Sequence, residues 1–244
     1  MGRNGGGCRL GVLAFGDSIT NGGGELQWGV ALQSWALWVA RGLGVPFTSY
    51  AVDGASVSDV VGSQIPAFGS RSAPRARYDV GCLYIGVNDV RSAGWDAVAF
   101  SLAFERALRF LDERCDRVLT VTAPLDLGRP RAGAKVGDLN AVIADVAAEV
   151  GALVVDLAGW GARNLVMTDH VHPTAFGQID IAERALDVLS SDGVRVEVRP
   201  SILISWSSSR WQRLRSDATY AYRHAKVSAW SAWVRARVAL RGSL

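Results

Sequence analysis

The sequence predicts an α/β fold in which helices cover both faces of a five-stranded parallel sheet, a three-layer α/β/α sandwich. Two observations predict this class. Short apolar runs alternate with longer helix-like stretches between Arg9 and Leu189, and the runs contain little polar alternation. Strands that are apolar throughout suit a parallel sheet buried on both faces. Right-handed crossovers between such strands favour a flavodoxin-like strand order.

Five apolar runs are expected to form the strands, and a helix is expected between or after them. The runs are Leu10–Phe15, Pro46–Val52, Val80–Val87, Val118–Ala123 and Leu153–Leu157. The helical stretches lie near residues 30–42, 56–63, 95–114, 135–150 and 174–189. Ligands of open parallel sheets bind beyond the carboxyl ends of the strands. Catalytic residues should therefore follow the apolar runs rather than lie inside them.

Composition indicates an ordinary globular protein with an added basic segment. The chain has 244 residues, of which 49% are hydrophobic and 20% charged. Residues 193–244 carry 10 Arg and Lys against 2 Asp and Glu, whereas residues 1–192 are mildly acidic. Such a split is typical of parts that meet different partners. We therefore predict a catalytic domain over residues 1–192 and a basic, mainly helical extension over residues 193–244.

The cysteines and the apolar segments indicate in which compartment the protein is expected. Cys8, Cys82 and Cys115 have neither the number nor the spacing of a disulfide framework or a zinc site. The apolar stretch near the N-terminus is only about six residues long, too short for a signal peptide. No run approaches the ~18 apolar residues of a membrane-spanning helix. We expect a cytoplasmic protein that needs no metal and no cofactor.

Four motifs fall where the fold would place catalytic groups, just after an apolar run. They are Gly16-Asp17-Ser18, Gly54, Gly86-Val87-Asn88-Asp89 and Asp169-His170-Val171-His172-Pro173. Asp17 and Asp89 are interpreted as turn-shaping residues. Pro173 suits the first turn of a helix, so the last motif should lie in the loop that opens it.

The residue types in these motifs match nucleophilic acyl transfer. A serine hydroxyl such as Ser18 needs a base to remove its proton. His172 titrates near neutral pH, and Asp169, three residues earlier, can fix its tautomer. The oxyanion formed from the attacked carbonyl needs hydrogen-bond donors. We expect these from the backbone N–H groups of Ser18 and Gly54 and from the Asn88 amide.

At these residues the sequence resembles the SGNH hydrolase superfamily, also called the GDSL esterase and lipase family. The family is named for its Ser, Gly, Asn and His, which here would be Ser18, Gly54, Asn88 and His172, in family order. The resemblance covers roughly residues 9–190. It implies a three-layer α/β/α fold, no metal, and hydrolysis of esters or thioesters. As the partner we expect a small-molecule ester substrate.

Other interpretations of these residues remain open at this point. Ser18 alone would also suit a helix N-cap, and His170 shares the loop with His172. Acyl transfer to an alcohol would use the same triad as hydrolysis. A third hypothesis is a scaffold that binds a membrane or a protein partner through its tail.

The tail predicts one long basic amphipathic helix from about Ser209 to Arg241. Apolar residues recur at three- and four-residue intervals, which defines one stripe of a helix. This stripe comprises Trp211, Leu214, Ala218, Tyr222, Ala225, Ala229, Trp233, Ala236 and Leu240. We expect the stripe to pack on the catalytic body, to pair with a second copy, or to lie on an anionic membrane surface. Nucleic acid is a less suitable partner, because only the charge favours it.

Overall fold

The computed structural model describes residues 9–71 and 76–241, with side chains up to residue 237, and confirms the expected sandwich. In these residues five parallel strands form one sheet in the order β2-β1-β3-β4-β5. The strands are β1 (Val12–Gly16), β2 (Phe47–Ser49), β3 (Tyr78–Tyr84), β4 (Cys115–Val121) and β5 (Leu153–Val155). This is the flavodoxin-like order that the sequence predicted.

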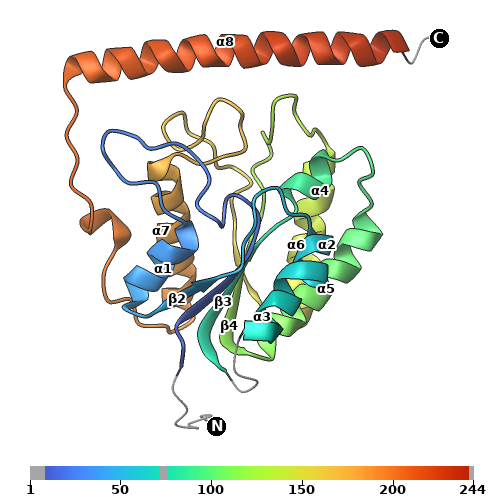
Figure 1. The fold of residues 1–244 in the computed structure, drawn as a ribbon, viewed down its shortest axis with the longest axis vertical. Coiled ribbons are helices and arrows are strands. Elements are labelled where there is room, and N and C mark those ends of the chain that lie inside the picture. Colours follow the sequence, from blue (N-terminus) through green and yellow to red (C-terminus); the bar gives the residue numbers. More distant parts are fainter. Residues whose placement is uncertain (1–8, 72–75, 242–244) are drawn as a thin grey trace.

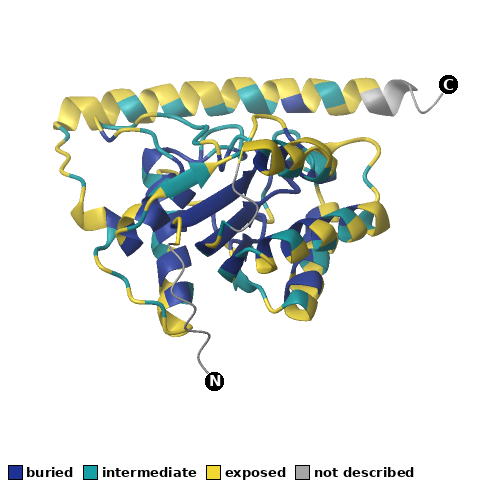
Figure 2. Ribbon diagram, turned by 60° about the horizontal axis from the view of Figure 1, so that its bottom comes forward, coloured by how far each residue is buried: buried dark blue, intermediate teal, exposed yellow. Residues whose placement is uncertain are grey.

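Helices cover both faces of the sheet, as Figure 1 shows. On one face lie α1 (Trp35–Leu43) and α7 (Ala175–Ser191). The other face is covered by α2 (Val57–Asp59), α3 (Ile65–Arg71), α4 (Val87–Arg91), α5 (Ala97–Asp112) and α6 (Lys135–Val150). Buried residues line the strands and the inward sides of the helices (Figure 2). Every residue of β1 is buried, which explains why that strand is apolar throughout.

Several helical segments differ from the sequence prediction. The first helix begins at Trp35 rather than near residue 30, and the helix expected to open at Pro173 begins at Ala175, after the Thr174 cap.

The helix expected to end near residue 63 instead continues through a π-helical turn, Val60–Gln64, into α3. Pro66 has no N–H to donate, and the wider turn just before it accommodates that missing hydrogen bond. The short helix α4 was not predicted, because five residues are too few to show a helical period.

Residues 193–209 run back along the body before the last helix begins. Residues 193–199 form a linker without regular secondary structure. Glu197 N and Val198 N donate to Gly42 O of α1, at 2.8 and 3.1 Å, and a short 3₁₀ turn follows at Pro200–Ile202. The division of the chain at residue 192 stays a prediction.

The last helix, α8 (Arg210–Arg241), has the predicted extent and lies across the loops at the carboxyl edge of the sheet (Figure 1). Ser209 caps it, because its Oγ accepts a hydrogen bond from Gln212 N at 3.2 Å. No helix in the part of the chain that the structure describes combines the length and apolar character needed to span a membrane.

α8 packs on the body through a polar face. The less exposed positions recur at helical spacing: Ser216, Tyr220, His224, Val227, Ser228, Ser231 and Val234. The expectation that the apolar stripe packs on the body is therefore wrong. The described stripe residues from Trp211 to Ala236 are all exposed, and we call them the outer stripe. The side chain of Leu240 lies outside the described residues. The loops beneath α8 offer charged partners, such as Glu25 for Arg223, rather than an apolar groove.

Candidate active site

The turn that carries Ser18 begins where β1 ends. Gly16 pairs with Tyr84 in the sheet register, so the chain must leave the strand beside a neighbouring backbone. A Cβ on Gly16 would lie 2.5 Å from Tyr84 O and 2.6 Å from Thr20 Oγ1, and its φ is +150°. Only glycine fits this position. The turn therefore brings Ser18 to the carboxyl edge of the sheet.

Two buried glutamines from distant helices hold this turn. Gly16 N donates to Gln64 Oε1 at 3.0 Å, and Gln64 Nε2 donates back to Gly16 O at 2.8 Å. Gln178 Nε2 donates to Ile19 O at 2.9 Å and to Gly23 O at 3.0 Å. Sequence reasoning missed both glutamines. Nothing in their local sequence separates them from surface residues of a helix.

The loop before α7 brings His172 and Asp169 to Ser18. The Ser18 hydroxyl lies 3.0 Å from His172 Nε2, and His172 Nδ1 lies 2.7 Å from Asp169 Oδ2. Asp169 Oδ1 also accepts hydrogen bonds from Val171 N at 2.9 Å and from His172 N at 3.1 Å. The predicted serine, base and carboxylate thus form one continuous chain of hydrogen bonds.

The pKa shifts along this series of hydrogen bonds suit a base that is held by a carboxylate. The hydrogen bond with Asp169 raises the pKa of His172 above its usual value, against the opposing effect of partial burial. For Asp169, burial acts to raise the pKa. The hydrogen bonds from His172 and from two backbone N–H groups outweigh burial and leave that pKa below its usual value. Asp169 is therefore ionised at neutral pH and favours a proton on His172 Nδ1.

The three expected oxyanion donors come from the ends of neighbouring strands. Val52 N donates to Gly16 O at 3.1 Å, which ties the segment before Gly54 to the one before Ser18. Gly54 has a φ of +77°, and a Cβ there would meet nothing within 4 Å. Glycine is therefore favoured at this position by the left-handed backbone conformation, and not by a close neighbour. Among the residues that the structure describes, neither Ser18 N nor Gly54 N has an acceptor.

Asn88 is the second residue of α4, directly beyond β3. Its Nδ2 donates to Ala55 O at 2.9 Å, which fixes the amide next to the Gly54 turn. An amide nitrogen carries two hydrogens, so one remains for a ligand. Helix α4 was not predicted from the sequence, yet it positions Asn88, which was.

Asp17 holds its own turn, as the sequence indicated, whereas Asp89 was wrongly expected to act locally and instead binds the start of α2. Asp17 Oδ1 accepts from Ile19 N at 2.9 Å, and both Asp89 oxygens accept from Val57 N, at 3.1 and 3.2 Å. Burial raises the pKa of Asp17 to about 7. Burial also raises the pKa of Asp89. Asp17 is 1% exposed, and its Oδ2 has no hydrogen-bond partner among the described residues.

His170 belongs to a different cluster. Arg129 Nη2 donates to His170 Nε2 at 2.9 Å, and His170 Nδ1 lies 2.9 Å from Asp126 Oδ2. Burial, aided by the Arg129 charge, lowers the pKa of His170. The ring is therefore neutral, with both nitrogens engaged away from Ser18. Within residues 9–71 and 76–237, no three His, Cys, Asp or Glu side chains gather as metal ligands.

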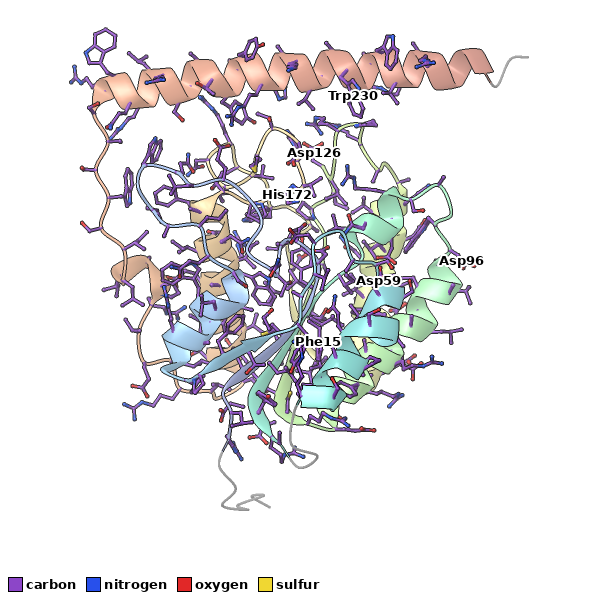
Figure 3. All side chains as sticks on the ribbon, in the orientation of Figure 1. Phe15, Asp59, Asp96, Asp126, His172 and Trp230 are labelled. Atoms are coloured by element: carbon purple, nitrogen blue, oxygen red, sulfur yellow. The ribbon has the colours of Figure 1, made fainter. Side chains whose placement is uncertain are left out.

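Helix α8 covers the space next to Ser18, Asp169 and His172. A cavity of about 330 Å³ is lined by Trp28 and Tyr220, and a neighbouring one of about 630 Å³ by Lys226 and Trp230. Thr168, the residue before Asp169, lines both. Figure 3 shows His172 between the sheet and α8, at the level of these loops. A substrate that reaches the triad from this side passes beneath the helix.

Comparison with protein families gives one match. The profile of the GDSL-like lipase/acylhydrolase family matches residues 14–178, a range that contains Ser18, Gly54, Asn88 and His172. Among curated proteins, no sequence matches the chain significantly.

Solved structures share the fold at low sequence identity. An acetylxylan esterase, Axe2 from Geobacillus stearothermophilus, is 19% identical with a TM-score of 0.57, covering 77% of this chain and 99% of its own. A member of the lipolytic protein G-D-S-L family from Veillonella parvula is 24% identical with a TM-score of 0.59, covering 73% and 97%. LAE5, an α/β hydrolase from the metagenome of Lake Arreo, is 18% identical with a TM-score of 0.58, covering 73% and 94%.

Proposed function

Because the chain belongs to the GDSL-like lipase/acylhydrolase family, and so is a carboxylic ester hydrolase, we propose that it acts through an acyl-enzyme on Ser18. The observation that carries this proposal is the unbroken hydrogen-bond chain from Ser18 Oγ through His172 to Asp169. A serine becomes a competent nucleophile when a correctly oriented base lies within hydrogen-bond distance of its hydroxyl.

In the first step, Ser18 Oγ attacks the carbonyl carbon of the ester. His172 Nε2 accepts the hydroxyl proton, and the carbonyl π electrons move to its oxygen. The tetrahedral intermediate collapses, the C–O bond to the alcohol breaks, and His172 returns the proton to the departing alcohol. Asp169 stabilises the transient imidazolium and keeps the ring in the right tautomer.

The backbone N–H groups of Ser18 and Gly54 and the free hydrogen of the Asn88 amide would bind the oxyanion. The free backbone donors support this role, as does the hydrogen bond that fixes Asn88 beside the Gly54 turn. In the second step, water replaces the alcohol. His172 removes a proton from water as the water oxygen attacks the acyl carbon. The bond between this carbon and Ser18 Oγ then breaks, His172 returns the proton to Oγ, and the acid leaves.

As substrates we propose small-molecule esters with short-to-medium acyl groups, acetyl esters included. The structural likeness to an acetylxylan esterase agrees with an acetyl ester, and cavities of a few hundred Å³ beneath α8 leave room for the rest of the molecule. The cytoplasm stays the compartment that we predict.

The test is hydrolysis of a p-nitrophenyl ester series, from acetate to long acyl chains, by the full chain and by Ser18→Ala. We expect turnover of the short members and its loss in Ser18→Ala. Ser190→Ala, which removes an exposed hydroxyl at the far end of α7, is the matched control and should retain full turnover. Turnover that survives in Ser18→Ala would overturn the proposal.

Product analysis separates hydrolysis from acyl transfer. Both reactions pass through the same acyl-enzyme, and they differ only in whether water or an alcohol attacks it. With glycerol or a sugar present as an acceptor, a hydrolase releases mainly free acid, whereas an acyltransferase releases mainly the new ester. We expect free acid.

A further inference from the structure

The outer stripe of α8 is exposed along its described length, although it contains large apolar side chains. Trp211 is 80% exposed, Tyr222 68%, Leu214 58% and Trp233 55%. At about 3.6 residues per turn, these residues and the alanines between them fall on one side of the helix, opposite Ser216, Tyr220 and Ser231. The fold therefore directs an apolar ridge away from the body.

The inner face of α8 is anchored to the body by charge. Arg223 Nη1 lies 2.8 Å from Glu25 Oε1, and Asp217 forms an ion pair with Arg163. The Arg163 guanidinium also lies over the Tyr220 ring, 5.1 Å from its centroid. These contacts fix which way the helix faces, so the outward direction of the ridge follows from the fold.

Cations flank the ridge on both sides. In α8, eight Arg and Lys accompany a single acidic residue, Asp217. Helical geometry places Arg215, Lys226 and Arg237 along one border of the ridge and Arg210 and Arg235 toward the other. The Arg237 guanidinium lies over the Trp233 ring at 4.7 Å.

We propose that this face of α8 docks on an anionic lipid surface. A helix with aromatic residues on one side and basic borders lies in the plane of a membrane interface, with its apolar residues among the acyl chains. Its cations then meet the lipid headgroups, which attract basic residues close to the surface. Indole rings suit this boundary because one part is apolar and the N–H is polar.

Charge complementarity favours lipid over the two other occupants. Pairing of two copies through this face would bring the basic borders together, and the only acid of the helix is already paired with Arg163. Nucleic acid would neutralise the cations but would leave the apolar ridge without a partner. An anionic membrane would bury the apolar ridge among its acyl chains and would also pair the cations of the borders with its headgroups.

Docking in this way would orient the catalytic edge of the sheet. α8 lies across the loops that carry Asp169 and His172 (Figures 1 and 3). A membrane bound to the far side of α8 would therefore lie over this edge, next to the cavity lined by Lys226 and Trp230.

Vesicle flotation with the full chain tests the proposal. We expect binding to phosphatidylcholine vesicles that contain roughly one third phosphatidylglycerol and little binding to phosphatidylcholine alone, with release at high salt. The variant Trp211→Ala/Trp233→Ala should bind the anionic vesicles about tenfold more weakly, because two interfacial anchors are lost.

The matched control removes two equally exposed apolar side chains elsewhere. Val98 and Leu102 on α5 are 70% and 61% exposed, and Val98→Ala/Leu102→Ala should bind as the wild type does. Helix content by circular dichroism and turnover of p-nitrophenyl acetate without vesicles should be retained in both double variants. The folding of each is thereby checked independently of binding.

Three outcomes would overturn the proposal. One is equal binding of the tryptophan variant and the wild type to anionic vesicles. Another is absence of vesicle binding together with self-association that the tryptophan variant loses, which would assign the ridge to a second copy. The third is duplex DNA binding that depends on Arg215 and Arg237 but not on the tryptophans, without vesicle binding.

Discussion

The turn at Ser18 and the loop at His172 meet at one hydrogen bond, yet the chain holds them in different ways. Ser18 lies in a turn whose backbone is bound by Gln64 and Gln178, side chains from helices far along the sequence. His172 is held within its own loop, where a single carboxylate, Asp169, binds the ring and two backbone N–H groups. The proposed nucleophile is positioned by tertiary contacts, and the proposed base by local ones.

This difference has a consequence for mutations. A change at Asp169 or His172 should alter catalysis and leave stability nearly intact, because these side chains are 37% and 31% exposed. A change in the side chains that support the Ser18 turn should lower both activity and stability, because Gln64 and Gln178 are buried in the core.

The largest effect is expected from Asp169→Asn. The amide oxygen can still accept from Val171 N and His172 N, but the carboxylate that fixes the His172 tautomer is lost. We expect kcat to fall about 10⁴-fold with little change in the unfolding midpoint. Steady-state kinetics and thermal unfolding measure the two quantities.

A matched control for this variant lies in the neighbouring cluster. Asp126 pairs with His170 much as Asp169 pairs with His172, but this pair points away from Ser18. Asp126→Asn should change kcat by no more than about threefold. Equal losses in the two variants would mean that Asp169 has no special part in holding the base.

The second-largest effect is expected from Gln64→Ala, which removes the hydrogen bonds that hold the Ser18 turn. Gly16 N would be left buried without its acceptor, Gly16 O would keep only the hydrogen bond from Val52 N, and a small cavity would form. We expect a loss of about 3–5 kcal/mol in the free energy of unfolding, together with a lower kcat. Urea denaturation followed by circular dichroism measures the loss. A stability equal to that of the wild type would show that the turn does not depend on this contact.

A third prediction concerns Asp17, beside the nucleophile. Its pKa in the folded chain is about 7, above the usual 3.8, so the native state binds this proton more tightly than the unfolded chain does. Stability from this group therefore falls as pH rises from about 4 to about 7 and is constant above that range. Asp17→Asn cannot ionise, so it should be more stable than the wild type at pH 8 by about 2–4 kcal/mol.

Denaturation of both proteins at pH 4 and pH 8 measures this difference. The advantage of Asp17→Asn should be present at pH 8 and nearly absent at pH 4. A difference that stays the same at the two pH values would contradict the assigned ionisation of Asp17.

The smallest effect is a shift in the pH profile. His172 must be neutral to accept the Ser18 proton, so kcat/KM should rise with pH as the imidazolium loses its proton. Because the hydrogen bond with Asp169 raises the pKa of His172, the midpoint should lie above the usual 6.5. In Asp169→Asn the residual activity should have a lower midpoint. A wild-type midpoint at or below 6.5 would argue against the pairing.

α8 shows where reasoning from the sequence succeeded and where it did not. Its extent, its cap at Ser209 and its apolar stripe follow from local pattern, and the structure has all three. The direction in which the stripe faces does not follow from pattern. That direction depends on which loops lie beneath the helix and which charges, such as Glu25, they present.

The sequence by itself determined the fold class, the five strands, their order and the residues of the catalytic motifs. These features depend on periodicity and on short motifs, which neighbouring residues encode. Only the tertiary structure decided that Gln64 and Gln178 support the nucleophile turn, that α4 presents Asn88, and that the outer stripe faces away from the body. Each of these depends on contacts between segments far apart in the chain, and no local pattern specifies such contacts before the chain has folded.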